Sequence, residues 1–112
     1  MSVQHPGLAA GRWFKLTLIE QMANVGSEVE RAILWRGRNN EAYSVKAIER
    51  ALELLDLTIA DAKNRGRLRE PLRVREALAD YFYADNLYGS SDALWHNYFY
   101  SFAYAARRRA SR

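Results

Sequence analysis

Apolar residues recur at steps of three and four positions along nearly all of this chain of 112 residues. Proline occurs only at Pro6 and Pro71, and runs of β-branched residues are absent. This spacing places apolar side chains on one face of an α-helix, whereas a half-buried strand would show alternation. The sequence therefore predicts an all-α protein.

Interruptions of the pattern divide the chain into four helical segments. Glycine and asparagine are common at helix ends, proline fits a first helical turn, and serine or asparagine caps a helix N-terminus. Gly37 is the expected C-terminal cap of the first segment. The expected helices run over about 12–36, from 39 or 40 to before Gly66, from about Pro71 to 85 or 86, and from Ser90 or Ser91 onward.

Short connections between these segments favour antiparallel neighbours. We therefore expect an antiparallel up-down-up-down four-helix bundle. Residues 12–109 form the expected single domain, with a flexible N-terminal tail at 1–11 and a basic C-terminal tail at 110–112.

Positive charge is concentrated by this topology. The formal net charge is +4, and 14 of the 17 basic residues are arginine. In such a bundle the N-terminus, the second loop and the C-terminus lie at the same end, which also holds Arg12, Lys15 and Lys63. We call this region the basic end, and its predicted binding residues are Arg65, Arg67, Arg69, Arg73, Arg75, Arg107, Arg108 and Arg109.

Arginine clusters of this kind are typical of proteins that bind a phosphate backbone, because the guanidinium fork pairs with phosphate or carboxylate groups. No helix-turn-helix spacing, zinc-finger pattern or RNA-recognition signature is present. The sequence thus predicts a non-enzymatic protein that binds RNA or DNA backbone, or an acidic partner, with little sequence preference. A solvated arginine surface is the alternative interpretation.

Ten of the fourteen aromatic residues lie between Tyr81 and Tyr104. On the fourth helix, Trp95, Phe99, Phe102 and Ala106 form the predicted apolar seam. The spacing turns Tyr100 and Tyr104 away from this seam. Exposed tyrosines indicate either self-association or stacking on bases, and Leu54 and Leu57, off the main apolar stripe of the second helix, favour self-association. A structural or adaptor homo-oligomer without nucleic acid is therefore the second hypothesis.

Carboxylates offer one enzymatic alternative. Glu49, Glu53 and Asp56 share a flank of the second helix, while Glu76 and Asp80 share a face of the third, so that they could hold Mg²⁺. This spacing is similar to that of the all-α nucleotide pyrophosphohydrolases, although only one half of their acidic motif is matched. Surface ion pairs with the many arginines are the favoured interpretation.

Other catalytic chemistry finds little support. Cysteine is absent, and neither His5 nor His96 belongs to a metal-ligand or nucleophile motif. We therefore expect no enzymatic activity, no cofactor and no metal. The sequence also lacks an apolar run long enough to span a bilayer and a signal peptide, which predicts a cytoplasmic protein without a membrane partner.

Several stretches resemble segments of a group of short prokaryotic all-helical proteins of uncharacterised function. They are 20–29 (EQMANVGSEV), 49–61 (ERALELLDLTIAD), 80–82 (DYF) and 85–86 (DN). The resemblance spans most of 13–107 and implies a helical, cytoplasmic protein. It implies no activity, cofactor or catalytic residue.

Overall fold

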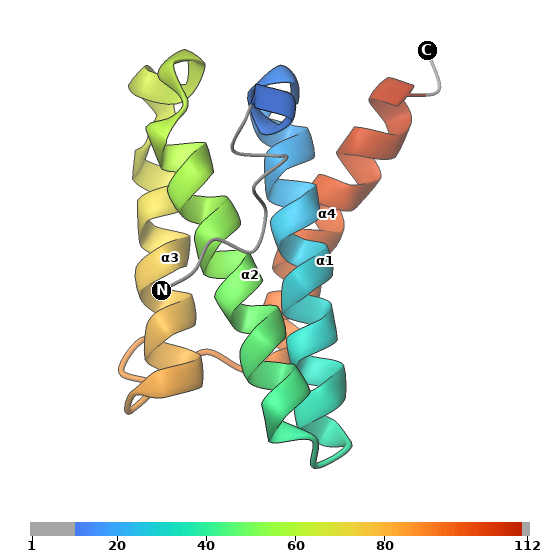
Figure 1. Cartoon of the computed structure of the whole chain (residues 1–112), viewed down its shortest axis with the longest axis vertical. Helices are drawn as coiled ribbons and strands as arrows, with labels where there is room; N and C mark the ends of the chain where they lie inside the picture. Colours follow the sequence, from blue (N-terminus) through green and yellow to red (C-terminus); the bar gives the residue numbers. More distant parts are fainter. Residues whose placement is uncertain (1–10, 111–112) are drawn as a thin grey trace.

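Four helices that run alternately up and down make up the structure, a computed structural model that describes residues 11–110 (Figure 1). The predicted all-α four-helix bundle is therefore confirmed. Residues 1–10 of the predicted N-terminal tail, and 111 and 112 of the C-terminal tail, lie outside the described residues. The elements are η2 (Trp13–Lys15), α1 (Leu18–Gly37), α2 (Glu41–Ala60), η3 (Ala62–Arg67), α3 (Arg69–Tyr83) and α4 (Asp92–Ala110).

Helix α1 begins later than predicted. Leu16 adopts extended backbone, which separates the short η2 from α1. Thr17 then caps α1 in a reciprocal capping box: its Oγ1 accepts a hydrogen bond from Glu20 N at 3.1 Å, and the Glu20 carboxylate accepts one from Thr17 N at 2.9 Å. The predicted single helix over 12–36 is thus two helices with a turn between them.

Asparagine, rather than glycine, shapes the turn between α1 and α2. Gly37 stays inside α1, while Asn39 takes the left-handed conformation with φ of 60°. Asn40 caps α2 by accepting a hydrogen bond from Tyr43 N at 3.1 Å. The predicted capping role of Gly37 was wrong, since asparagine also tolerates positive φ.

Helices α1 and α2 form a central antiparallel pair. Helix α4 packs against α1 and α3 packs against α2, whereas α3 and α4 hardly touch each other (Figure 1). The two outer helices are joined by the 84–91 loop at one end of the bundle and diverge towards the other. The bundle is consequently open along the side between α3 and α4.

The core is continuous from η2 to α4. It includes Trp13 and Leu54 as well as Trp95 and Phe99 of the predicted α4 seam. Leu57 is partly buried against the same cluster. Leu54 and Leu57 therefore pack within the single chain, and the argument for self-association that used them was wrong. No helix within 11–110 combines the length and apolar character needed to cross a bilayer.

Gly26 sets the distance between α1 and α4. A Cβ atom at this position would lie 2.7 Å from Phe99 Cβ, closer than side-chain carbons approach in proteins. The neighbour at this close approach is the Phe99 side chain rather than another backbone. The absence of a side chain at Gly26 thus allows Phe99 of α4 to pack directly against α1.

Candidate functional site

A buried polar network anchors the loop that carries several of the predicted arginines. Gln21 and Asn64 are fully buried, and Asn64 Nδ2 donates to Gln21 Oε1 and to Thr58 O, both at 2.9 Å. Gln21 Nε2 donates to Trp13 O at 3.1 Å, and Trp13 Nε1 donates to Thr58 Oγ1 at 3.2 Å. The network joins η2, α1, the end of α2 and η3.

Asp61 is the charged member of this network. Its Oδ2 accepts a hydrogen bond from Gln21 Nε2 at 2.8 Å and pairs with the Lys63 ammonium, while its Oδ1 accepts from Lys63 N at 3.1 Å. Burial favours a raised pKa, but the hydrogen bonds from Lys63 and Gln21 outweigh it and hold the pKa of Asp61 below its usual value. Asp61 also caps the N-terminus of η3, so the start of this loop is held in place.

The predicted basic end is assembled in space. Figure 1 shows η2 and the start of α1, the end of α2 with η3 and the start of α3, and the end of α4 all at one end of the bundle. Arg65, Arg67, Arg69 and Arg73 are exposed there, and none forms an ion pair with another residue in 11–110. They are four guanidinium groups turned to solvent.

Arg75 does not belong to this group. Its Nε and Nη2 atoms donate to the two carboxylate oxygens of Asp56 at 2.6 and 3.3 Å. The hydrogen bond with Asp56 raises the pKa of Arg75. This guanidinium joins α3 to α2, so the prediction that it contributes to binding loses its support.

Most other arginines in the described chain are also engaged. Arg36 pairs with Asp92 at 3.0 Å and lies over the Tyr81 and Phe82 rings. Arg31 and Arg50 both approach Glu28 at 3.7 Å, and Arg38 lies over the Trp35 ring. Outside the basic end the arginines therefore contact a carboxylate or, for Arg38, an aromatic ring, whereas Arg65, Arg67, Arg69 and Arg73 have no carboxylate partner within 11–110.

The end of α4 contributes a second group of arginines, separated from the first because α4 diverges from α3 (Figure 1). Arg107, Arg108 and Arg109 are exposed. Arg108 lies over the Tyr104 ring at 5.9 Å. Hydrogen bonds from Thr17 chiefly lower the pKa of Glu20, and the positive charge of Arg109 adds to this effect.

The predicted outward tyrosines are exposed. Tyr100 is 56% and Tyr104 is 49% accessible to solvent. Both lie on α4, on the side away from the buried Trp95 and Phe99, as the spacing predicted.

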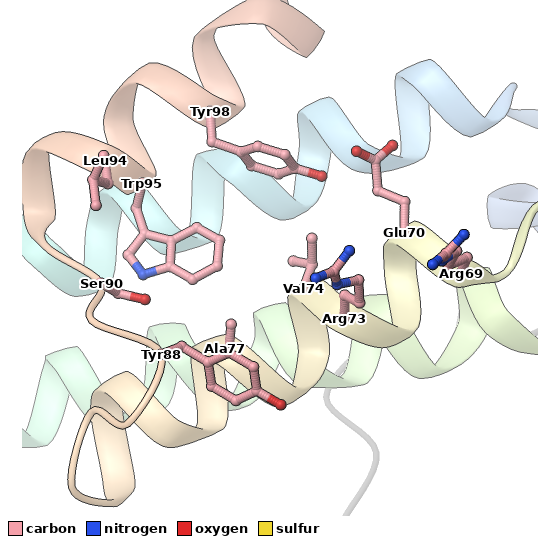
Figure 2. A pocket seen from close by; sticks show the side chains of 10 residues that line it. All are labelled: Arg69, Glu70, Arg73, Val74, Ala77, Tyr88, Ser90, Leu94, Trp95 and Tyr98. Carbon is pink, nitrogen blue, oxygen red and sulfur yellow. The ribbon is translucent and has the colours of Figure 1, made fainter.

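A groove between α3 and α4, absent from the sequence prediction, leads to the basic end. It encloses about 550 Å³ and is lined by side chains from both helices and from the 84–91 loop (Figure 2). Val74, Ala77, Leu94, Trp95 and Tyr98 provide apolar and aromatic surface. Arg69, Glu70 and Arg73 lie along the α3 wall, and Tyr88 and Ser90 belong to the loop.

Two aromatic side chains of this groove carry polar atoms without a hydrogen-bond partner in the part of the chain that the structure describes. Trp95 is 7% exposed, and its Nε1–H has no acceptor among the described residues. The Tyr98 hydroxyl likewise lacks a hydrogen bond of normal geometry, although it lies near Glu70. Burial, and then the negative charge of Glu70, raises the pKa of Tyr98 far above its usual value, so the hydroxyl keeps its proton.

The carboxylates that suggested Mg²⁺ binding have structural partners. Asp56 pairs with Arg75, and Glu76 Oε2 accepts a hydrogen bond from the Tyr88 hydroxyl at 3.0 Å. Asp80 accepts from Leu87 N at 2.9 Å and Tyr88 N at 3.0 Å, which holds the 84–91 loop. Within 11–110, no group of three or more metal-ligating side chains is placed to bind a metal ion.

Comparisons with known proteins place the chain in no family. No known protein family matches it, and neither a curated protein nor a solved structure is significantly similar to it. The resemblance to short prokaryotic helical proteins therefore stays a prediction.

Proposed function

We propose that this protein is a non-enzymatic binding module whose basic end holds the phosphate backbone of RNA or DNA. The observation that carries the proposal is the contrast between its arginines. Arg65, Arg67, Arg69 and Arg73 have no carboxylate partner in the described chain, whereas Arg36 and Arg75 pair with aspartate. Guanidinium groups without an internal partner keep their donors available for phosphate oxygens.

The anchoring of η3 supports the same proposal. The buried contacts of Asp61 and Asn64 fix the backbone from which Arg65 and Arg67 project. A loop that is already ordered loses less conformational freedom when it binds a ligand. Contacts with phosphate carry no sequence information, so we expect binding to depend on salt and to tolerate different sequences.

Replacing Arg65, Arg67 and Arg69 together with glutamine should weaken binding to every nucleic acid tested. Each lost phosphate contact should also reduce the slope of log affinity against log salt by about one. Fluorescence anisotropy with labelled single-stranded RNA, single-stranded DNA and duplex DNA, at low and near-physiological salt, measures both quantities. Circular dichroism should show unchanged helicity.

A triple variant with the same loss of charge provides the control. Arg31→Gln, Arg38→Gln and Lys46→Gln remove three exposed positive charges away from the basic end. If this variant weakens binding as much as the first, net charge rather than the basic end is responsible. If the unmodified protein binds no nucleic acid even at low salt, the proposal fails, and an acidic protein becomes the partner to seek.

The exposed tyrosines of α4 favour a second candidate function, a structural or adaptor homo-oligomer. Tyr100 and Tyr104 are about half exposed, and tyrosine is enriched in protein–protein interfaces. An assembly held by aromatic packing should keep its mass in about 1 M salt, where charge contacts are screened. Sedimentation of the unmodified protein and of the Tyr100→Ser, Tyr104→Ser variant tests this, and a monomeric mass for both would exclude it.

A further inference from the structure

The groove between α3 and α4 has the size and position of a ligand site connected to the basic end. Its volume of about 550 Å³ lies within the range of small-molecule pockets, about 300–1,000 Å³. Its lining runs from Tyr88 and Ser90 in the 84–91 loop to Arg69 at the start of α3, so the groove reaches the basic end. A nucleic-acid strand bound along the basic end would therefore pass the end of this groove.

Aromatic side chains line the groove from two elements. Trp95 and Tyr98 on α4 make an edge-to-face pair, with ring centroids 5.9 Å apart and planes at 88°. Tyr88 stands on the loop side of the same groove, where its hydroxyl donates to Glu76 and its backbone N–H donates to Asp80 (Figure 2). Tyr88 is exposed and Tyr98 is half-buried, and accessible aromatic faces are platforms on which a nucleic-acid base stacks. Trp95, in contrast, is buried and supports Tyr98 from the core.

The polar groups of the groove suit a base with one phosphate. The Nε1–H of Trp95 lacks an acceptor in the described chain and is covered in the unbound protein, so a base edge can accept from it only after the neighbouring side chains move. Arg69 and Arg73 line the α3 wall without ion-pair partners, while Glu70 on the same wall offsets one of the two positive charges. The remaining charge matches a single phosphodiester.

We infer that the α3–α4 groove takes one unstacked base of a single-stranded nucleic acid, with the adjoining phosphate at Arg69 and Arg73. The inference rests on the proposed function, because it assumes that the basic end holds the backbone. It adds a preference for single strands, since the bases of an intact duplex are paired and stacked and cannot enter the groove.

Ala77→Phe tests the inference, because the added ring occupies groove volume without removing an arginine. Affinity for a single-stranded oligonucleotide should fall about 5- to 150-fold, the range expected for losing the stacking of one base. Affinity for duplex DNA should not change. Tyr88→Leu, which keeps an apolar side chain but removes the aromatic face, should produce a smaller loss in the same direction.

Two controls identify the cause of any loss. Ala42→Phe adds the same ring at an exposed position of α2, outside the groove, and should leave both affinities unchanged. An oligonucleotide made only of abasic sugar-phosphate units should bind the unmodified protein and Ala77→Phe equally well. Circular dichroism and the thermal midpoint establish that each variant is folded.

The outcomes separate the inference from the proposed function. If single strands, abasic strands and duplexes bind the unmodified protein equally well and Ala77→Phe changes nothing, the groove takes no base, although the basic end still binds backbone. If neither single strands nor duplexes bind at low salt, the proposed function fails and the inference fails with it. A selective loss for base-bearing single strands in Ala77→Phe supports both.

Discussion

Replacing Asp61 with alanine should lower the free energy of unfolding by about 1–3 kcal/mol, as expected when a buried donor loses its acceptor. Asp61 is 6% exposed and accepts hydrogen bonds from Gln21 Nε2 and Lys63 N. Without the carboxylate, Gln21 Nε2 keeps only its hydrogen bond to Trp13 O, and Lys63 N loses its side-chain acceptor. Urea unfolding followed by circular dichroism measures the change.

Asp56→Ala is the matched control, because it also removes a carboxylate that pairs with a basic residue. The Asp56 side chain is 50% exposed, so its loss should cost only about 0–1 kcal/mol. Equal losses for the two variants would contradict the structural role assigned to the Asp61 network.

The same network makes the free energy of unfolding depend on pH. The folded protein holds the pKa of Asp61 below its ordinary value of 3.8. The stabilisation from the charged carboxylate is therefore fully present above about pH 3.8 and is lost as the pH falls through the lower, folded-state pKa. On acidification below that value, the difference in stability between the unmodified protein and Asp61→Ala should shrink; a constant difference would contradict this interpretation.

Gly26→Leu should cost about 3 kcal/mol or detach α4 from α1, because even a Cβ atom at Gly26 would overlap Phe99. Gly26→Ala should cost less, since the better helix propensity of alanine offsets about 1 kcal/mol of the strain. Urea unfolding measures each change, and the near-ultraviolet circular dichroism of the buried aromatic residues reports detachment.

A double-mutant cycle with Phe99→Ala shows whether the two residues are coupled. If Phe99 is the obstacle, Gly26→Ala should be less harmful in the Phe99→Ala background, by about 0.5–3 kcal/mol. Gly37→Leu is the control within α1, because nothing lies within 4 Å of a Cβ built at Gly37. A loss at Gly37 as large as that at Gly26 would rule out the explanation by close packing.

Periodicity predicted which residues of each helix are buried, but not which helices become neighbours. Trp95 and Phe99 were correctly assigned to the inner face of α4, since that assignment needs only the helical repeat. The helical repeat gives the buried face of each helix but not the helix that packs against it. The lack of packing between α3 and α4 could therefore not be predicted from the repeat. The pairing of Arg75 with Asp56 was missed for the same reason.

The buried polar network was also missed, although one residue of it left a signal. Gln21 lies on the apolar stripe of α1, three residues after Leu18 and four before Val25, where a polar side chain needs a buried partner. Asn64 gave no such signal, because it lies in a short loop helix among arginines. The gathering of charge at the basic end was accessible from the sequence because it follows from topology alone.

The helices pack side by side in the order α3, α2, α1, α4, so each outer helix has one main neighbour. The outer helices should therefore unfold locally more easily than the central pair. The central α1–α2 hairpin cannot open without losing contacts on both sides, whereas α3 or α4 can separate while the hairpin stays intact. Backbone amides should accordingly exchange with deuterium fastest in the outer helices and slowest in the hairpin. The surface proposed for ligand binding therefore lies between the two parts of the chain that open most readily.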